Sequence, residues 1–224
     1  MIEHFWHRLP GPIWFNANEI YREQVVHARD GAVFVELGAW KGRSTAFMGV
    51  EIANSATDIE FYAVDTWLGS AAESVHDADP DLQEGTLHQA FLQNIEPVRA
   101  YVRPLRELST QAATRFGDGG VDFVFVDAGH TYQDVTNDLV AWWPKVRPGG
   151  VMAGDDWTLR DQKDGQRSVR RAVRRYFNRP DCFYAIELWK GTTHPEWTQW
   201  LVRKDGGTTT NLVRKMRGTI AAAR

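Results

Sequence analysis

Apolar and polar positions alternate along the chain in blocks that predict strands and helices in turn. Short apolar runs rich in β-branched and aromatic residues predict strands, and apolar positions repeated every three or four residues predict helices. The expected strands are residues 32–37, 61–64, 101–103, 121–126 and 151–154. The expected helices are residues 19–29, 44–53, 87–95, 109–116, a segment that follows Thr131 and ends at Pro144, and 168–177. This alternation is typical of a parallel sheet with crossover helices.

Three further segments depart from this alternation. Residues 182–189 and 197–203 are expected to be two strands that form an antiparallel hairpin around residues 191–195. Residues 68–85 are polar and acidic without clear periodicity, so we interpret them as a loop that could act as a lid, together with the N-terminal segment 1–30. Residues 205–224 are expected to be partly disordered.

Composition points to one domain and to a small partner. A chain of 224 residues fits a single domain, residues 1–224. The net charge of −3 gives no electrostatic reason to expect a nucleic acid or an anionic membrane as partner, so a small-molecule acceptor is expected. The single cysteine, Cys182, suits a reducing compartment, and the cytoplasm is the simplest location. No apolar run approaches the ~20 residues that span a bilayer, and residues 1–12 lack the apolar core of a signal peptide. A homo-oligomer is compatible with the sequence.

Acidic residues follow two of the expected strands. Asp127 comes directly after residues 121–126, with His130 three positions later, and Asp155 and Asp156 come directly after residues 151–154. Ligands of open α/β sheets lie at the carboxyl ends of the strands, and carboxylates are ligands that Mg²⁺, Mn²⁺ and Ca²⁺ prefer. The pattern predicts a metal-assisted active site. The alternative is structural, since the aspartate pair could cap a helix and His130 could merely begin one.

The spacing of the glycines in the turn after the first strand indicates which kind of nucleotide ligand could bind there. Residues 36–44 read Glu-Leu-Gly-Ala-Trp-Lys-Gly-Arg-Ser, which is Gly-x-x-x-Gly and not the Gly-x-Gly-x-x-Gly of a dinucleotide site. Asp65 ends the next strand, where an acid can accept hydrogen bonds from both hydroxyls of a ribose. A nucleoside without pyrophosphate therefore fits better. Such a turn also occurs in doubly wound proteins that bind another nucleotide or none.

Residues 30–203 resemble the class I S-adenosylmethionine-dependent methyltransferases. Asp127-x-x-His130, followed by Gly149-Gly150 and Asp155-Asp156, is similar to the metal-dependent O-methyltransferases of the catechol and macrolide-sugar types. The chain has His130 where the catechol type has lysine and Asp156 where that type has an amide, which favours the sugar type.

This resemblance implies a fold and a set of roles. The fold would be α/β, a doubly wound Rossmann-like methyltransferase fold with a seven-stranded, mostly parallel sheet and an antiparallel C-terminal edge hairpin. The implied cofactor residues are Glu36, Gly38 and Ser44 at the methionine part, Asp65 at the ribose, Ser109 beside the adenine, and Asp127. The implied metal ligands are Asp127, Asp155 and Asp156, with Mg²⁺ as the expected cation, and His130 would be the general base.

The expected function is therefore a divalent-metal-dependent O-methyltransferase that uses S-adenosylmethionine. Its acceptor would be a sugar or natural product with vicinal oxygens. The alternatives are a nicotinamide-dependent oxidoreductase, which the glycine spacing disfavours, and a noncatalytic relative of the same fold. An arginine-rich segment, residues 167–179, is either a solvated helix face or a grip on a phosphate-bearing or carboxylate-bearing acceptor.

Overall fold

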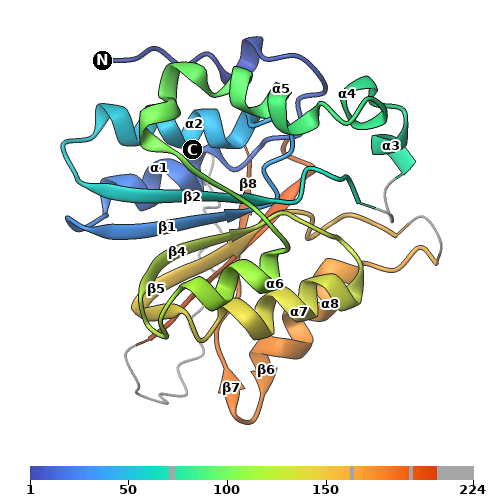
Figure 1. Ribbon diagram of the computed structural model, residues 1–224. Coiled ribbons are helices and arrows are strands. Elements are labelled where there is room, and N and C mark those ends of the chain that lie inside the picture. Colours follow the sequence, from blue (N-terminus) through green and yellow to red (C-terminus); the bar gives the residue numbers. More distant parts are fainter. Residues whose placement is uncertain (71–73, 162–163, 192–193, 206–224) are drawn as a thin grey trace, which may run out of the picture.

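A computed structural model of the protein describes residues 1–70, 74–161, 164–191 and 194–205. Its centre is a seven-stranded sheet in the order β3-β2-β1-β4-β5-β9-β8, with helices on both faces (Figure 1). The strands are β1 (Ala32–Leu37), β2 (Ile59–Asp65), β3 (Arg103–Arg106), β4 (Val121–Val126), β5 (Val146–Gly154), β8 (Glu187–Lys190) and β9 (Thr198–Arg203). β1 to β5 are parallel, and β9 and β8 form an antiparallel hairpin at one edge. The predicted fold class is confirmed.

A layer of helices packs on each face of the sheet, and each layer forms its own apolar core with the sheet. One face is covered by α1 (Asn18–Val26), α2 (Arg43–Asn54), α5 (Leu87–Asn94) and the 3₁₀ helix η2 (Glu96–Tyr101). The other is covered by α6 (Ser109–Ala112), the 3₁₀ helix η3 (Ala113–Arg115), α7 (Tyr132–Trp142) and α8 (Ser168–Phe177). Every residue of β4 is buried, as expected for a parallel strand between two layers. This central strand and its neighbours fix where the acidic residues emerge.

Several strand predictions were wrong in their bounds. The fifth strand was expected at residues 151–154, but β5 begins at Val146. The third strand was expected at residues 101–103, but Tyr101 ends η2 and β3 begins at Arg103. β3 is an edge strand that pairs only with β2, which is why it tolerates Pro104. Residues 182–189 were expected to be one strand, but they divide into β7 (Cys182–Phe183) and β8. β7 pairs with β6 (Asn178–Arg179), directly after α8, and only β8 joins the main sheet.

The expected lid, residues 68–85, contains two short helices. These are α3 (Ser74–Asp77) and α4 (Pro80–Gln83), and the Asp79 carboxylate caps α4 by accepting a hydrogen bond from the Asp81 amide. Both helices lie at the carboxyl end of the parallel strands (Figure 1). Lys41, in the turn after β1, holds this segment through ion pairs of 2.8 Å to Asp79 and 2.5 Å to Asp81.

The structure describes the N-terminal segment but only the first residue of the expected C-terminal tail. The N-terminal segment contains the 3₁₀ helix η1 (Trp6–Arg8) and α1, and it packs against the core beside α2. The expected flexible tail is residues 205–224, of which residues 206–224 lie outside the described residues. No helix in the described part of the chain is long and apolar enough to cross a membrane.

Candidate active site

The acidic residues predicted from the strand ends surround a cavity of about 630 Å³. Asp127 follows β4, and Asp155 and Asp156 follow β5, so neighbouring parallel strands deliver all three to one edge of the sheet. His130 reaches the same place from the loop before α7, whose N-cap is Thr131. These residues line the cavity together with aromatic side chains from distant segments, namely Trp14, Trp40, His76 and Trp197.

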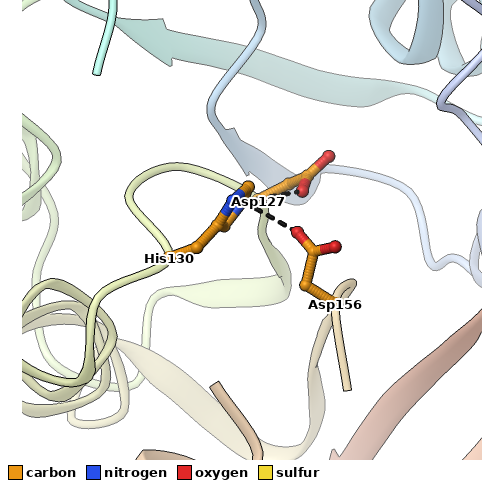
Figure 2. A group of neighbouring side chains, drawn as sticks. All are labelled: Asp127, His130 and Asp156. Carbon is orange, nitrogen blue, oxygen red and sulfur yellow. Dashed lines mark ion pairs between the residues drawn. The ribbon is translucent and has the colours of Figure 1, made fainter. Parts of the chain in front are cut away.

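Asp127, His130 and Asp156 form a compact group (Figure 2). The His130 Nε2 atom lies 2.8 Å from Asp156 Oδ2 and 3.6 Å from Asp127 Oδ1. One ligand atom from each residue lies within 4.8 Å of the other two. The exposed fraction of the side chain is 21% for His130, 32% for Asp127 and 25% for Asp156. Small molecules in the cavity can therefore reach all three. Two carboxylates and an imidazole are a suitable donor set for a divalent cation.

The backbone after β5 separates the two adjacent aspartates. Asp156 has a φ of 62°, a left-handed conformation that is uncommon for residues other than glycine. Asp155 Oδ1 instead accepts hydrogen bonds from the Asp156 amide at 2.8 Å and from Gln199 Nε2 on β9 at 3.0 Å. The structure therefore brings Asp127, Asp156 and His130 together and leaves Asp155 beside them. The predicted ligand role of Asp155 and the predicted base role of His130 stay predictions.

Burial and mutual repulsion disfavour negative charge among these carboxyl groups. Burial, followed by the charge of Asp156, raises the pKa of Asp155 to about 7. Burial also raises the pKa of Asp127 well above its usual range, and the neighbouring aspartates add to this, while a hydrogen bond from His130 opposes it. A bound cation would favour the ionised carboxylates and offset this cost. The residues present therefore fit a metal site.

The glycine turn after β1 is built for close approach of backbone. Gly38 has a φ of +88°, and a Cβ atom there would lie 1.9 Å from the backbone oxygen of Asp127. Only glycine fits this position, because the ends of β1 and β4 converge on it. The turn therefore contacts the acidic group directly.

Two of the predicted cofactor residues, Glu36 and Ser44, are buried next to this turn. Glu36 is 1% exposed and accepts hydrogen bonds from the Tyr21 hydroxyl at 2.7 Å and from the Thr45 hydroxyl. Burial raises the pKa of Glu36, while hydrogen bonds from Thr45, Ser44 and Tyr21 lower it. Ser44 is also buried, and neither residue lines the cavity.

Asp65 has backbone partners that the sequence did not reveal. Its Oδ2 atom accepts hydrogen bonds from the amides of Ala39 at 2.9 Å and Trp40 at 2.8 Å, and Oδ1 accepts one from the Trp67 amide at 2.7 Å. The bond to Trp67, two residues on, is a common aspartate turn and could have been anticipated. Asp65 therefore fixes the turn after β1 to the end of β2. Its predicted role at the ribose stays a prediction.

Ser109 lies in the contact between α6 and α7. Its hydroxyl donates to Asp138, and its backbone oxygen accepts a hydrogen bond from Trp142 Nε1 at 3.0 Å. Burial raises the pKa of Asp138 to about 7. The predicted adenine contact of Ser109 is not tested by this geometry, because Ser109 does not line the cavity.

The cavity has an aromatic wall whose members were not identified from the sequence. The ring centres of Trp40 and His76 are 4.2 Å apart and nearly parallel, and Trp14 lies 5.4 Å from His76. All three line the cavity that contains the acidic group. A tryptophan between two glycines of the turn was the available signal, but its partners come from segments far away in sequence. The wall connects the glycine turn to α3.

The strand order, the edge hairpin and the glycine turn beside acidic strand ends define the class I methyltransferase fold. The chain belongs to the methyltransferase domain family, whose model matches residues 35–157, more than half of the chain. The chain therefore has the family and the fold of the class I methyltransferases.

Comparisons with individual proteins are consistent with this family. The protein y4gI of Sinorhizobium fredii (strain NBRC 101917 / NGR234) is 32% identical over 141 residues, which are 63% of this chain and 15% of that protein. The O-methyltransferase NovP has a TM-score of 0.60 and 18% identity, with 84% of this chain and 79% of NovP covered. A Bacillus cereus O-methyltransferase, solved in complex with SAH, has a TM-score of 0.54 and 18% identity, with 88% of this chain and 86% of that chain covered. At these identities the two structures show the shared fold alone.

Proposed function

We propose that the protein is an S-adenosylmethionine-dependent O-methyltransferase that uses a divalent cation to bind a small acceptor with vicinal oxygens. The observation that carries this proposal is the Asp127, His130 and Asp156 group in a cavity beside the glycine turn. The methyltransferase family supports the reaction class, and the SAH bound to the Bacillus cereus enzyme supports the cofactor. A sugar or natural product as acceptor, a cytoplasmic location and the absence of nucleic acid or membrane partners belong to the same proposal.

The acidic group would hold the cation, and His130 would handle the proton. Asp127 and Asp156 would be ligands, and Asp155, which lines the same cavity, would be a third. When bound, the cation would lower the pKa of an acceptor hydroxyl and orient it. His130 would accept the hydroxyl proton, and the Asp156 carboxylate at 2.8 Å would stabilise the resulting imidazolium. Bound S-adenosylmethionine would supply the methyl group to the hydroxyl oxygen and leave as S-adenosylhomocysteine.

The turn after β1 and Asp65 would bind the cofactor. A carboxylate offers about four acceptor positions on its two oxygens, and three are used by backbone amides in this structure. Oδ1 carries one of those bonds and Oδ2 two, so Oδ1 has room for a ribose hydroxyl. The glycine spacing offers no pyrophosphate site of the usual kind, which separates this proposal from a nicotinamide-dependent oxidoreductase.

Binding and turnover experiments test the proposal in two steps. Calorimetry with SAH and with NAD should show binding of SAH alone. Turnover is then measured with a panel of catechol, sugar and glycoside acceptors, with Mg²⁺ or with EDTA. Absence of SAH binding would reject the proposal, and SAH binding without turnover on any acceptor would favour a noncatalytic relative.

A further inference from the structure

A second concave surface lies beside the cavity, with a volume of about 370 Å³. We call it the arginine groove, after the five arginines that line it: Arg160, Arg167, Arg170, Arg171 and Arg174. Four of them come from α8 and its N-cap, and Arg160 comes from the loop before it. This concentration of positive charge is a local feature of the surface, since the chain as a whole has a net charge of −3.

α8 presents these arginines from a firmly packed helix. Its opposite face, with Val173 and Phe177, is buried in the core against the sheet. Two of the guanidinium groups also lie over aromatic rings, Arg170 over Trp157 at 5.6 Å and Arg171 over Tyr132 at 4.7 Å. The helix and these rings hold the groove in shape, so an anion would meet an organised set of donors.

Carboxylate partners for the charges of the groove are not found among the residues that the structure describes. Within the described ranges, none of the five arginines forms an ion pair with a carboxylate, whereas Arg29, Arg103 and Arg203 elsewhere on the surface all do. The Arg167 Nε atom is buried and has no hydrogen-bond partner. Between residues 167 and 174, each of these arginines has another arginine three or four residues away, where like charges repel. A solvated helix face normally intersperses acids at these positions, so the uncompensated arrangement favours an anionic ligand.

The groove opens beside the proposed acceptor site. Arg160 lines both the groove and the cavity that contains the acidic group. Ser168 and Val169 line the cavity, and their neighbours Arg167 and Arg170 line the groove. A molecule with one end in the cavity can therefore extend its other end along α8.

We propose that the arginine groove binds a phosphate or diphosphate group of the acceptor, as in a sugar phosphate or a sugar nucleotide. This inference rests on the proposed function and specifies its substrate class. Arginine suits the task because its planar fork donates two hydrogen bonds to one phosphate. The small concave volume fits one or two phosphate groups, whereas a nucleic acid duplex needs a longer stripe of cations along successive phosphates.

The test uses inorganic pyrophosphate as the probe in isothermal titration calorimetry. EDTA is present, so a cation at the acidic group cannot contribute to binding. The double variant Arg170→Gln/Arg174→Gln removes two charges from the groove and retains good helix propensity. The matched control is Arg175→Gln, because Arg175 is exposed on the same helix but does not line the groove. We expect the double variant to bind pyrophosphate at least tenfold more weakly and the control to stay within twofold of wild type.

Three results would overturn the assignment. They are no binding of pyrophosphate by the wild type, an equal loss in the Arg175→Gln control, or groove-dependent binding of RNA or anionic vesicles that is tighter than that of pyrophosphate. SAH titration of the same proteins reports separately on the proposed function. SAH binding without pyrophosphate binding would reject the groove alone. Pyrophosphate binding without SAH binding would reject the methyltransferase proposal, and with it the acceptor role of the groove, while the groove would stay a phosphate-binding surface. Once an acceptor is found, kcat/KM can be measured for phosphorylated and for unphosphorylated sugars. The ratio of the first value to the second should fall in the double variant and stay unchanged in the control.

Discussion

His130 lies between two carboxylates, and this position allows two chemical roles. Its Nε2 atom is 2.8 Å from Asp156, as a base with a stabilising partner would be. The same atom also belongs to the group whose ligand atoms lie within 4.8 Å of one another, as a metal ligand would. We propose the base role, and the two roles differ in what a substitution does to metal affinity.

Replacing His130 by alanine should lower turnover by ~10²–10⁴-fold, the usual contribution of a general base. Mn²⁺ and SAH should still bind with nearly unchanged affinity, as measured by calorimetry, because the imidazole would contact neither. Asp156→Asn is the comparison, since it should weaken Mn²⁺ binding. A large loss of Mn²⁺ affinity in His130→Ala would instead make His130 a ligand, and unchanged turnover would remove it from the mechanism.

Asp138 should make the protein less stable as pH rises. Burial raises its pKa to about 7 from an ordinary value near 3.8. A carboxyl group with a raised folded-state pKa favours the folded state when protonated, so this stabilisation is full below about pH 4 and lost as pH rises through 7. Asp138→Asn keeps an acceptor for the Ser109 hydroxyl without the charge.

We expect Asp138→Asn to exceed wild type in free energy of unfolding at pH 8, by up to ~4 kcal/mol, and to show little gain at pH 4. Urea denaturation at the two pH values measures this. Asp181→Asn is the control, because its carboxylate is largely exposed at 76%. Equal pH dependence in wild type and Asp138→Asn would contradict the expectation.

At the scale of elements, the turn between β1 and α2 joins the cofactor end of the site to the acidic end. Gly38→Ala should destabilise the protein strongly, because the new Cβ would lie 1.9 Å from the Asp127 backbone oxygen at a φ of +88°. Gly31→Ala is the control. Gly31 also has a positive φ, +69°, but a Cβ atom added there would have no neighbouring atom within 4 Å.

Both glycine variants should therefore share a backbone cost of ~1 kcal/mol, and Gly38→Ala should add at least ~1–3 kcal/mol from the clash. Thermal denaturation compares them. Calorimetry should also show loss of SAH binding in Gly38→Ala only. Similar melting temperatures for the two variants would mean that β1 and β4 can separate at this point.

Asp65 connects two elements, since its carboxylate holds the turn after β1 to the loop after β2. Hydrogen bonds to a charged acceptor contribute ~1.5–3 kcal/mol each, so Asp65→Ala should weaken SAH binding at least tenfold and lower the melting temperature. Thr66→Ala is the adjacent control, because its hydroxyl accepts a single bond from the Leu68 amide. Wild-type SAH affinity in Asp65→Ala would exclude Asp65 from the cofactor site.

At the scale of the whole molecule, a bound cation should stabilise the fold. Partial burial is the chief cause of the raised pKa values of the Asp127 and Asp155 carboxyl groups, and a cation would favour their ionised forms. A ligand at a hundred times its Kd adds ~2.7 kcal/mol to stability. Mg²⁺ or Mn²⁺ should thus raise the melting temperature of wild type at pH 8 but not that of Asp156→Asn.

Turnover should also depend on the bound cation. EDTA should abolish methyl transfer, and added Mg²⁺ or Mn²⁺ should restore it, while the affinity for SAH changes little. Full activity in EDTA would reject the metal role and leave the acidic group as a purely electrostatic feature of the cavity.

The sequence by itself determined the sheet and the edge at which the site lies. The run 121–126 predicted a buried strand, and parallel neighbours end at the same edge, so Asp127 and the pair after residue 154 were expected at one edge of the sheet. The edge hairpin followed from two short apolar runs near a turn. These features depend on local periodicity and on topology rules, which a sequence carries directly.

Only the tertiary structure decided which side chains face one another. The left-handed backbone at Asp156 sends one aspartate toward His130 and leaves its neighbour on Gln199. The wall of Trp14, Trp40 and His76 joins segments distant in sequence. Side-chain direction depends on dihedral angles and on packing against partners brought together by the whole fold, and no local pattern encodes those partners.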